Sequence, residues 1–201
     1  MSTLLIVGAS GKMGTALVAA ALAAGHRVNA LVRSRAKAAH LPAGVTIFEG
    51  DGRDAGALAA ALKGTDAVVI PAGGRKEPVT AQVVGAALPA MGRLGIKRLI
   101  VLSAYGALDG AGFYRWMMQT LAKPVSADKV ETERLLRASS ADWTAVRPGI
   151  LTEGPATGKV RAGENVVLKG MPQVSRADVA AFVMGELDTP RFVRKSPVVY
   201  V

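Results

Sequence analysis

The sequence predicts an α/β fold in which helices cover both faces of a mainly parallel sheet, a doubly wound arrangement in three layers (α/β/α). Three observations predict it. Short apolar runs alternate with helix-like segments, a glycine-rich turn joins the first run to an alanine-rich segment, and 201 residues suit one domain with a sizeable core. Half of the residues are hydrophobic but only 4% are aromatic, so small aliphatic side chains must form close helix-on-sheet layers.

The apolar runs predict the strands. The run at 66–70 is almost wholly apolar, which is typical of a strand buried on both faces of a parallel sheet. The doubly wound (Rossmann) strand order 3-2-1-4-5-6 would place a ligand where the order reverses, at the ends of the first and fourth strands. The expected strands span 3–7, 27–32, 45–49, 66–70, 98–102, 143–146 and 198–201.

Capping and stop signals bound the helices between these strands. Asp54 and Ser175 each precede a helical segment and can accept hydrogen bonds from its first-turn amides. Pro124 disfavours helix at Lys123, so we expect an interruption there. The expected helices span 15–24, 55–62, 113–121, 126–139 and 175–187, with one ending near 94 and at most a short one at 35–40.

The segment 126–139 has the pattern of an amphipathic helix on the protein surface. Two i,i+4 ion pairs are expected on it, Lys129–Glu133 and Glu133–Arg137. Its apolar side is expected to carry Val130, Leu135 and Leu136. The less regular regions at about 104–125 and 149–174 are expected to be small substrate-side insertions of one domain, 1–201, with loops and a short hairpin in the second.

Composition excludes several classes of site. There are no cysteines, and His26 and His40 lie outside any ligand spacing, so we expect no metal site. The N-terminus lacks a signal-peptide pattern and no apolar run is long enough to cross a membrane, so we expect a cytoplasmic protein, monomeric or homodimeric. The net charge of +10 attracts anions, but it is scattered and not interleaved with aromatic residues, so we do not expect specific nucleic-acid binding.

The turn at 8–14 is the strongest candidate for a binding site. It has the spacing G-x-x-G-x-x-G between a strand and a helix, where unpaired main-chain N–H groups favour an anion. Gly8 permits the turn, Gly11 allows a pyrophosphate to approach, and Gly14 lets the helix lie close to the strand. Lys12 could also face the phosphates. The alternative is a tight turn that binds nothing; the flanking strand and helix favour a dinucleotide.

The residue that ends the second strand bears on the choice of dinucleotide. An acidic residue there would favour NAD by accepting from the ribose 2′-hydroxyl. The sequence instead has Arg33, followed by Ser34 and Arg35, and a guanidinium suits a 2′-phosphate. We therefore expect NADP(H), the alternative being that both arginines are solvated surface charges.

The ends of the third and fourth strands face the same crevice. Asp51 can accept from an adenine amino group, and Gly52 keeps the approach open. Ala72 and Gly73 are small enough for a cofactor to pass close. Each of these segments alone could equally be a turn or a cap.

Candidates for the chemistry follow the fifth and sixth strands. Ser103 could hydrogen-bond a nicotinamide carboxamide or a substrate carbonyl, or simply satisfy a strand end, and Tyr105 could reach the same cleft as a proton donor. No Tyr-x-x-x-Lys pair exists, because Val125 stands four residues before Lys129, and Lys129 is expected in a surface ion pair. Backbone groups of 148–150 could hold the nicotinamide end. The residues expected to bind the cofactor are Gly8, Ser10, Gly11, Lys12, Met13, Gly14, Arg33, Asp51, Gly52, Ala72, Gly73, Ser103, Pro148, Gly149 and Ile150, with Ser103 and Tyr105 as catalytic candidates.

With these motifs the chain resembles an atypical short-chain dehydrogenase/reductase of the NAD(P)H-binding, NmrA-like group, and is similar to its small members of the biliverdin IXβ reductase/flavin reductase type. The matching stretches are 8–14, 31–33, 50–51, 102–103, 142–149 and 175–180. The resemblance implies NADPH in the glycine-turn crevice, with Arg33 on its 2′-phosphate and Ser103 near the nicotinamide.

The resemblance also implies an oxidoreductase that transfers hydride to a flavin, a quinone or a similar flat small molecule. Such acceptors need little beyond an oriented, dry nicotinamide, which fits a chain without Tyr-x-x-x-Lys. The alternative is a non-catalytic, NADP(H)-sensing regulatory protein, because the NmrA-like group includes such sensors. A third possibility, an epimerase or dehydratase, is disfavoured by the missing tyrosine.

Overall fold

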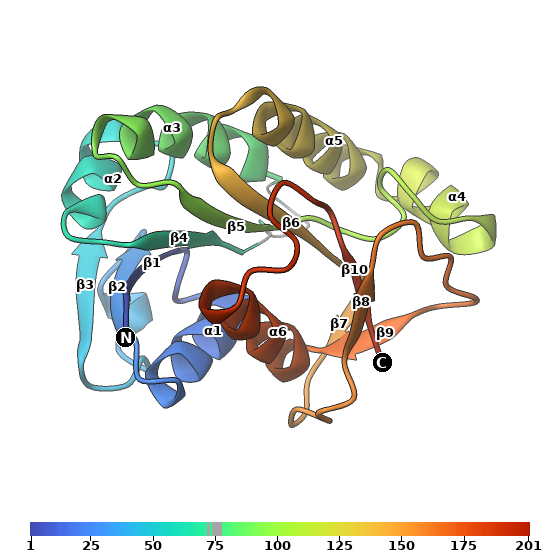
Figure 1. Ribbon diagram of the computed structural model, residues 1–201, viewed down its shortest axis with the longest axis horizontal. Coiled ribbons are helices and arrows are strands. Elements are labelled where there is room, and N and C mark those ends of the chain that lie inside the picture. Colours follow the sequence, from blue (N-terminus) through green and yellow to red (C-terminus); the bar gives the residue numbers. More distant parts are fainter. Residues whose placement is uncertain (72, 74–77) are drawn as a thin grey trace.

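A mainly parallel sheet forms the centre of the molecule, with helices on both faces (Figure 1). The computed structural model describes residues 1–71, 73 and 78–201. Within them, the strands of the main sheet lie in the order β3-β2-β1-β4-β5-β6-β10-β8, and β7 pairs with β9 in a separate small sheet. The strands are β1 (Thr3–Val7), β2 (Arg27–Val32), β3 (Val45–Glu49), β4 (Ala67–Ile70), β5 (Arg98–Leu102), β6 (Asp142–Pro148), β7 (Ile150–Thr152), β8 (Arg161–Gly163), β9 (Gln173–Ser175) and β10 (Val198–Tyr200). The order of the first six strands confirms the predicted doubly wound sheet.

The helices divide the core into two halves, one on each side of the sheet. Two helices, α1 (Lys12–Ala23) and α6 (Arg176–Asp188), pack together on one face of the sheet. Three others, α2 (Ala55–Leu62), α3 (Thr80–Arg93) and α5 (Lys123–Ala138), cover the opposite face and have an apolar cluster of their own. A further helix, α4 (Gly112–Thr120), contacts α5 at one end of the molecule. Among the described residues, none of the helices combines the length and apolar composition that a membrane crossing requires.

Two details differ from the sequence-based expectation. Helix α5 already begins at Lys123, because Pro124 sits in its first turn, where a missing N–H is no loss. The short hairpin expected within 149–172 was wrong: β7 pairs with β9 in parallel, and β8 pairs antiparallel with β10. β8 thereby extends the edge of the main sheet, whereas β7 and β9 form a small sheet of their own, in which β9 leads directly into α6.

At the turn between β1 and α1 the helix lies close to the strand that precedes it. Gly8 has a φ of 71° and donates its N–H to the carbonyl of Leu31 at 2.8 Å. A Cβ on Gly14 would lie 2.3 Å from the Gly8 carbonyl oxygen, so α1 can approach only because residue 14 has no side chain. This contact confirms the close helix–strand packing expected of Gly14.

We expect Gly14→Ala to lower the free energy of unfolding by about 1–3 kcal/mol or more, because the added methyl overlaps backbone atoms that cannot move aside. Urea denaturation followed by circular dichroism measures this change. Gly92→Ala in α3 is the control. Nothing lies within 4 Å of its added Cβ, so it should be neutral or stabilise the protein by up to about 1 kcal/mol. Equal stability of the two variants would contradict the close approach.

Candidate functional site

A cleft of about 460 Å³ opens at the carboxyl ends of the first four strands. It lies where the order of the sheet reverses between β1 and β4, the position at which doubly wound sheets bind ligands. Its lining residues are Val7, Gly8, Ser10, Gly11, Leu31, Arg33, Lys37, Gly50, Asp51, Gly52, Arg53, Ile70, Pro71, Gly73, Val79, Thr80 and Val83. The lining includes Gly8, Ser10, Gly11, Arg33, Asp51, Gly52 and Gly73 from the residues that the sequence singled out.

The glycine turn presents bare main chain to this cleft. Gly11 is the N-cap of α1 and has no side chain to accept from the first-turn N–H groups, and no acidic residue follows in that turn. The amides at the helix N-terminus are therefore available to an anion. The next two side chains turn away: Lys12 is exposed and pairs with Glu153 at 3.1 Å, and Met13 is buried in the core.

Basic side chains also line the cleft. Arg33 and Lys37 both line it and are exposed, so their charges face an incoming ligand. Sequence reasoning did not single out Lys37. Lys37 lies within the short 3-10 helix Ala36–Ala38, and the cluster of basic residues at 33–37 is the signal that could have revealed it.

Asp51 lines the cleft but its carboxylate is already engaged. Two N–H groups of the Arg53 side chain donate to it at 2.9 and 2.7 Å, and the Arg53 main-chain N–H donates at 2.8 Å. These hydrogen bonds, together with the charges of Arg53 and Arg33, lower the pKa of Asp51 to about 2. The neighbouring Gly52 is required sterically, since a Cβ there would lie 2.7 Å from a methyl of Val7.

A buried lysine lies beneath the edge of the cleft that follows β4. Thr80 lines the cleft; its hydroxyl oxygen accepts from the N–H of Gly73 at 3.0 Å and from Nζ of Lys129 at 2.5 Å. Lys129 is only 1% exposed and also donates to Asp128 at 3.0 Å. Burial lowers the pKa of Lys129, although the Asp128 carboxylate partly opposes this shift. Ala72 lies outside the described residues.

The expected surface ion pair of Lys129 was therefore wrong. The buried side of α5 carries Lys129 and Glu133, whereas Val130, expected on that side, is 45% exposed. Leu136 is fully buried and Leu135 packs against the same core cluster, as expected. The physical reason for the difference is that Lys129 and Glu133 find buried partners on other elements, so polar side chains share the buried side of the helix with these leucines. No signal in the single sequence distinguishes such a buried lysine from a solvated one.

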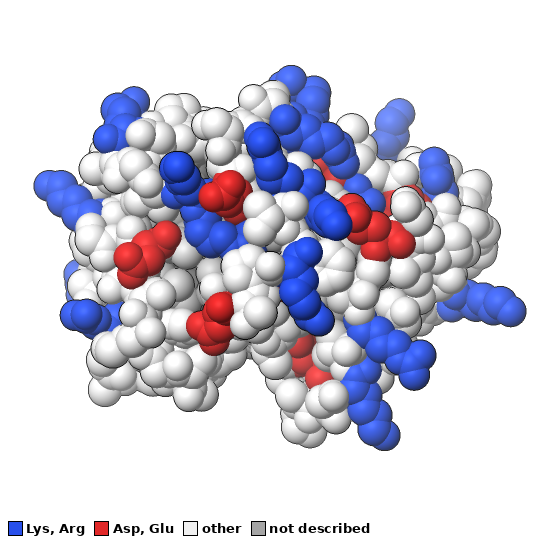
Figure 2. Space-filling model, in the orientation of Figure 1, with Lys and Arg blue, Asp and Glu red and all other residues white. Residues whose placement is uncertain are grey.

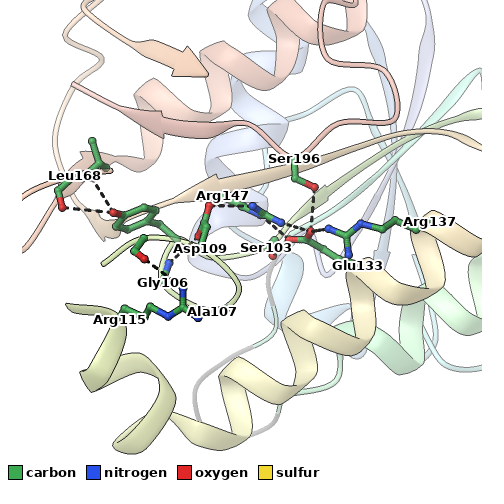
Figure 3. Close-up of polar contacts among 12 residues, drawn as sticks. Ser103, Gly106, Ala107, Asp109, Arg115, Glu133, Arg137, Arg147, Leu168 and Ser196 are labelled. Atoms are coloured by element: carbon green, nitrogen blue, oxygen red, sulfur yellow. Dashed lines mark hydrogen bonds and ion pairs between the residues drawn. The ribbon is translucent and has the colours of Figure 1, made fainter. Parts of the chain in front are cut away.

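Ser103, at the end of β5, belongs to a second buried polar cluster (Figure 3). Its hydroxyl donates to Oε1 of Glu133 at 2.8 Å. The carboxylate of Glu133 has no exposed surface and also accepts from Arg147 at both oxygens, from Ser196 at 3.0 Å and from Arg137 at 2.6 Å. The Glu133–Arg137 pair confirms one of the two ion pairs expected on this helix.

Glu133 is held as a carboxylate by these donors. Burial alone would raise the pKa of Glu133, but the hydrogen bonds and charge of Arg147, with the hydroxyls of Ser103 and Ser196, bring it below its usual value. Arg147 is fixed in turn by Asp109, which accepts from it at 2.9 Å. Because Glu133 only accepts, the hydroxyl proton of Ser103 is committed to it.

The remaining candidates lie around the end of β6. Tyr105 is fully buried; its hydroxyl accepts from the N–H of Leu168 at 2.8 Å, and its ring stacks on Tyr114. The carbonyl of Pro148 accepts from the main-chain N–H of Tyr105 at 2.9 Å. Gly149 packs against Pro172, where a Cβ would lie 2.4 Å from the carbonyl oxygen, and Ile150 donates to the same carbonyl at 2.8 Å. This group of residues is beyond the described lining of the main cleft.

Comparison with known proteins agrees with this arrangement. The model of the NAD(P)H-binding family matches residues 8–190, from the glycine turn to the end of α6. The chain belongs to the NAD(P)H-binding family. Membership confirms the resemblance to the atypical short-chain dehydrogenases/reductases of NmrA-like type and places the chain among NAD(P)H-dependent oxidoreductases. Among the described residues of this family member, no group of His, Asp and Glu is arranged to hold a metal ion.

Relatives of the chain within this group carry different names. "Uncharacterized sugar epimerase YhfK" of Bacillus subtilis (strain 168) is 32% identical over 196 residues, covering 91% of this chain and 86% of the relative. "Isoflavone reductase homolog IRL" of Zea mays is 30% identical over 221 residues, 100% of this chain and 68% of the relative. The solved structure of ChuY, described as an anaerobillin reductase, from Escherichia coli O157:H7 superimposes with a TM-score of 0.83 at 26% identity, covering 99% and 97% of the two chains.

We expect Glu133→Gln to lower the free energy of unfolding at pH 7 by about 3–5 kcal/mol, because it leaves the charge of buried Arg147 without its main partner. The folded-state pKa of Glu133 is depressed, so its stabilising effect is present above the ordinary value of 4.5 and is lost as the pH falls below it. The difference in free energy of unfolding between the variant and the original protein should therefore become smaller when denaturation is measured at acidic pH. Glu131→Gln on the same helix removes an exposed carboxylate and should change little; equal effects of the two substitutions would contradict the assigned network.

Proposed function

We propose that the chain is an NADPH-dependent reductase that passes a hydride to a flat acceptor such as a flavin or a quinone. The observation that carries this proposal is one cleft lined both by the bare N-terminus of α1 and by two basic side chains, Arg33 and Lys37. A dinucleotide with a phosphate on its ribose presents anions at both places. When bound, NADPH supplies the hydride; the residues of this chain bind it, orient it and exclude water.

Different parts of the cleft are proposed to hold different parts of the cofactor. In the proposal, the main-chain amides of the turn from Gly8 to Gly14 hold the diphosphate, with Ser10 beside them. Arg33 and Lys37 receive the 2′-phosphate, where a guanidinium fork and an ammonium both suit a dianion. Asp51 keeps Arg53 at the adenosine end and stays ionised, while Gly52 leaves room for the base.

The nicotinamide end is proposed to lie beyond β4, towards Ser103. Since the Ser103 proton is committed to Glu133, the remaining lone pairs of its oxygen can only accept hydrogen bonds. A hydroxyl oxygen that only accepts hydrogen bonds suits the amide N–H of a nicotinamide carboxamide. It cannot donate a hydrogen bond to a substrate carbonyl. We therefore propose Ser103 as a residue that orients the cofactor, and Tyr105 as a residue that holds the loop containing Leu168.

An acceptor that needs no protein proton donor fits this arrangement. The hydroxyl of Tyr105 is engaged with main chain, and the sequence has no Tyr-x-x-x-Lys pair. Flavins and quinones take hydride into a conjugated ring and can obtain their proton from solvent. Proximity and alignment then supply most of the reduction in the barrier.

We expect steady oxidation of NADPH, followed at its absorbance band, when the protein is supplied with FMN or a quinone. Tight binding of NADPH without turnover of any flavin or quinone in a panel would overturn the reductase proposal. That result would favour a regulatory NADP(H) sensor. The sensor predicts different partner affinity for the oxidised and reduced cofactor. Because a relative is named a sugar epimerase, nucleotide sugars belong in the panel; epimerisation without net NADPH consumption would also overturn the reductase.

We expect Arg33→Asp to raise the Kd for NADPH by roughly ten- to hundredfold, the equivalent of about 1.5–3 kcal/mol for hydrogen bonds to a charged phosphate. NADH lacks that phosphate, so its Kd should rise far less. Isothermal titration calorimetry with both cofactors measures the difference. Arg35→Asp is the matched control: it reverses a charge two residues away, but the Arg35 side chain donates to the carbonyl of Ile47 and is not among the lining residues. Equal losses for NADPH and NADH would refute the role of Arg33.

A further inference from the structure

A second pocket, of about 250 Å³, lies away from the cofactor cleft. It is formed by the last turn of α5, β6, the residues that follow β8 and the segment before β10, and among the described residues it shares no lining residue with the cleft. Its lining residues are Arg137, Trp143, Arg147, Glu164, Asn165, Arg194, Lys195 and Ser196. Lys and Arg side chains gather over the surface where α5 and this segment lie (Figure 2).

The pocket is rich in hydrogen-bond donors carrying positive charge. Three basic side chains stand at its exposed part: Arg137 is half-exposed and donates to Glu133, Arg194 donates to the carbonyl of Ser139 at 2.6 Å, and Nζ of Lys195 lies 3.8 Å from Glu164. Each of these contacts uses only part of the donor capacity, since a guanidinium has five N–H groups and an ammonium three. The lining therefore offers several donors to an acceptor that enters it.

Trp143 forms a buried wall of the pocket. This tryptophan lines the pocket and is 4% exposed, and its indole N–H finds no hydrogen-bond partner among the described residues. An indole can only donate, and a buried donor without an acceptor is uncommon in native proteins. The Nε1 atom itself has almost no accessible surface, so an acceptor in the pocket reaches this donor only if the wall shifts. Trp143 is therefore a reporter beside the pocket, and the basic side chains are the groups that bind.

The backbone around the pocket is also unusual. Among the described residues, Asn165 and Arg194 are the non-glycine residues with positive φ, at 57° and 58°, and both line this pocket. Asparagine tolerates this conformation, but arginine adopts it seldom. The main-chain N–H of Arg194 donates to the carbonyl of Trp143 at 2.6 Å, which holds the strained residue against β6.

We propose that this pocket binds a small oxyanion, of the class of inorganic phosphate or a dicarboxylate. The side of the pocket next to Glu133 is already neutralised, because Arg137, Arg147 and Ser196 all donate to the Glu133 carboxylate. Arg194 and Lys195 are therefore the groups that meet the anion. The anion supplies the acceptors that the pocket lacks, and its charge is matched by two cations at the mouth.

Tryptophan fluorescence tests this proposal directly. The sequence has two tryptophans, and the other one, Trp116, is exposed on α4. Trp116→Phe therefore leaves Trp143 as a single reporter beside the pocket. Titration with inorganic phosphate, and separately with succinate, is compared with NaCl at the same ionic strength. We expect a saturable change in Trp143 emission with phosphate or succinate and none with NaCl.

Variants in the Trp116→Phe background identify the groups that bind. Arg194→Asn removes the guanidinium but keeps a residue that tolerates positive φ, and Lys195→Gln removes the ammonium. Each should raise the apparent Kd for the anion by roughly tenfold or more. Arg134→Gln is the matched control, because Arg134 is an exposed arginine on α5 that pairs with Glu131 and does not line the pocket. Arg33→Asp should also leave the response unchanged, which separates this pocket from the cofactor cleft.

Each result of the titrations either supports the proposed anion site or overturns it. Saturation with phosphate alone identifies a phosphate site, and saturation with both anions identifies a general oxyanion site. A Trp143 signal that follows ionic strength only overturns the proposal. So does a saturable response that Arg194→Asn and Lys195→Gln leave equal to that of Arg134→Gln.

Discussion

The carboxylate of Glu133 carries a charge in the interior, so donors from other parts of the chain must surround it. Arg147 comes from β6, Ser103 from the end of β5, Ser196 from the segment before β10, and Arg137 from the next turn of the same helix. A buried ion pair of this kind adds little net stability, because desolvation offsets most of the attraction, but losing one partner is costly. The cluster therefore fixes how three strands and a helix meet, and it sets the direction of the Ser103 hydroxyl.

Helix α5 carries polar side chains on its buried side, and two of them contact the segments that follow β4 and β5. Lys129 holds Thr80, at the start of α3, and so supports the segment after β4. One turn later, Glu133 holds Ser103, after β5. Because both contacts are buried and come from one rigid helix, the edges of the site after β4 and after β5 are positioned together.

The two pockets illustrate two ways of making a place for an anion. In the main cleft, proposed to hold the cofactor, glycines leave the main chain bare and the amides at the start of α1 provide the field, with Arg33 also in the lining. In the second pocket, side-chain cations gather at the end of α5 and around Arg194, whose backbone is held in a left-handed conformation. The first arrangement suits an extended ligand, and the second suits a compact one.

Sequence alone determined the sheet order and the glycine turn, and it identified part of the lining of the main cleft, because these depend on local signals. Apolar runs mark the strands, glycines at 8, 11 and 14 mark the turn, and the residues that follow parallel strands must meet at one edge. Only the tertiary structure decided the rest. Whether Lys129 and Glu133 are solvated or buried, which partner β7 and β8 take, and where Arg194 meets Trp143 all depend on contacts between residues far apart in the chain, and no short stretch of sequence encodes such contacts.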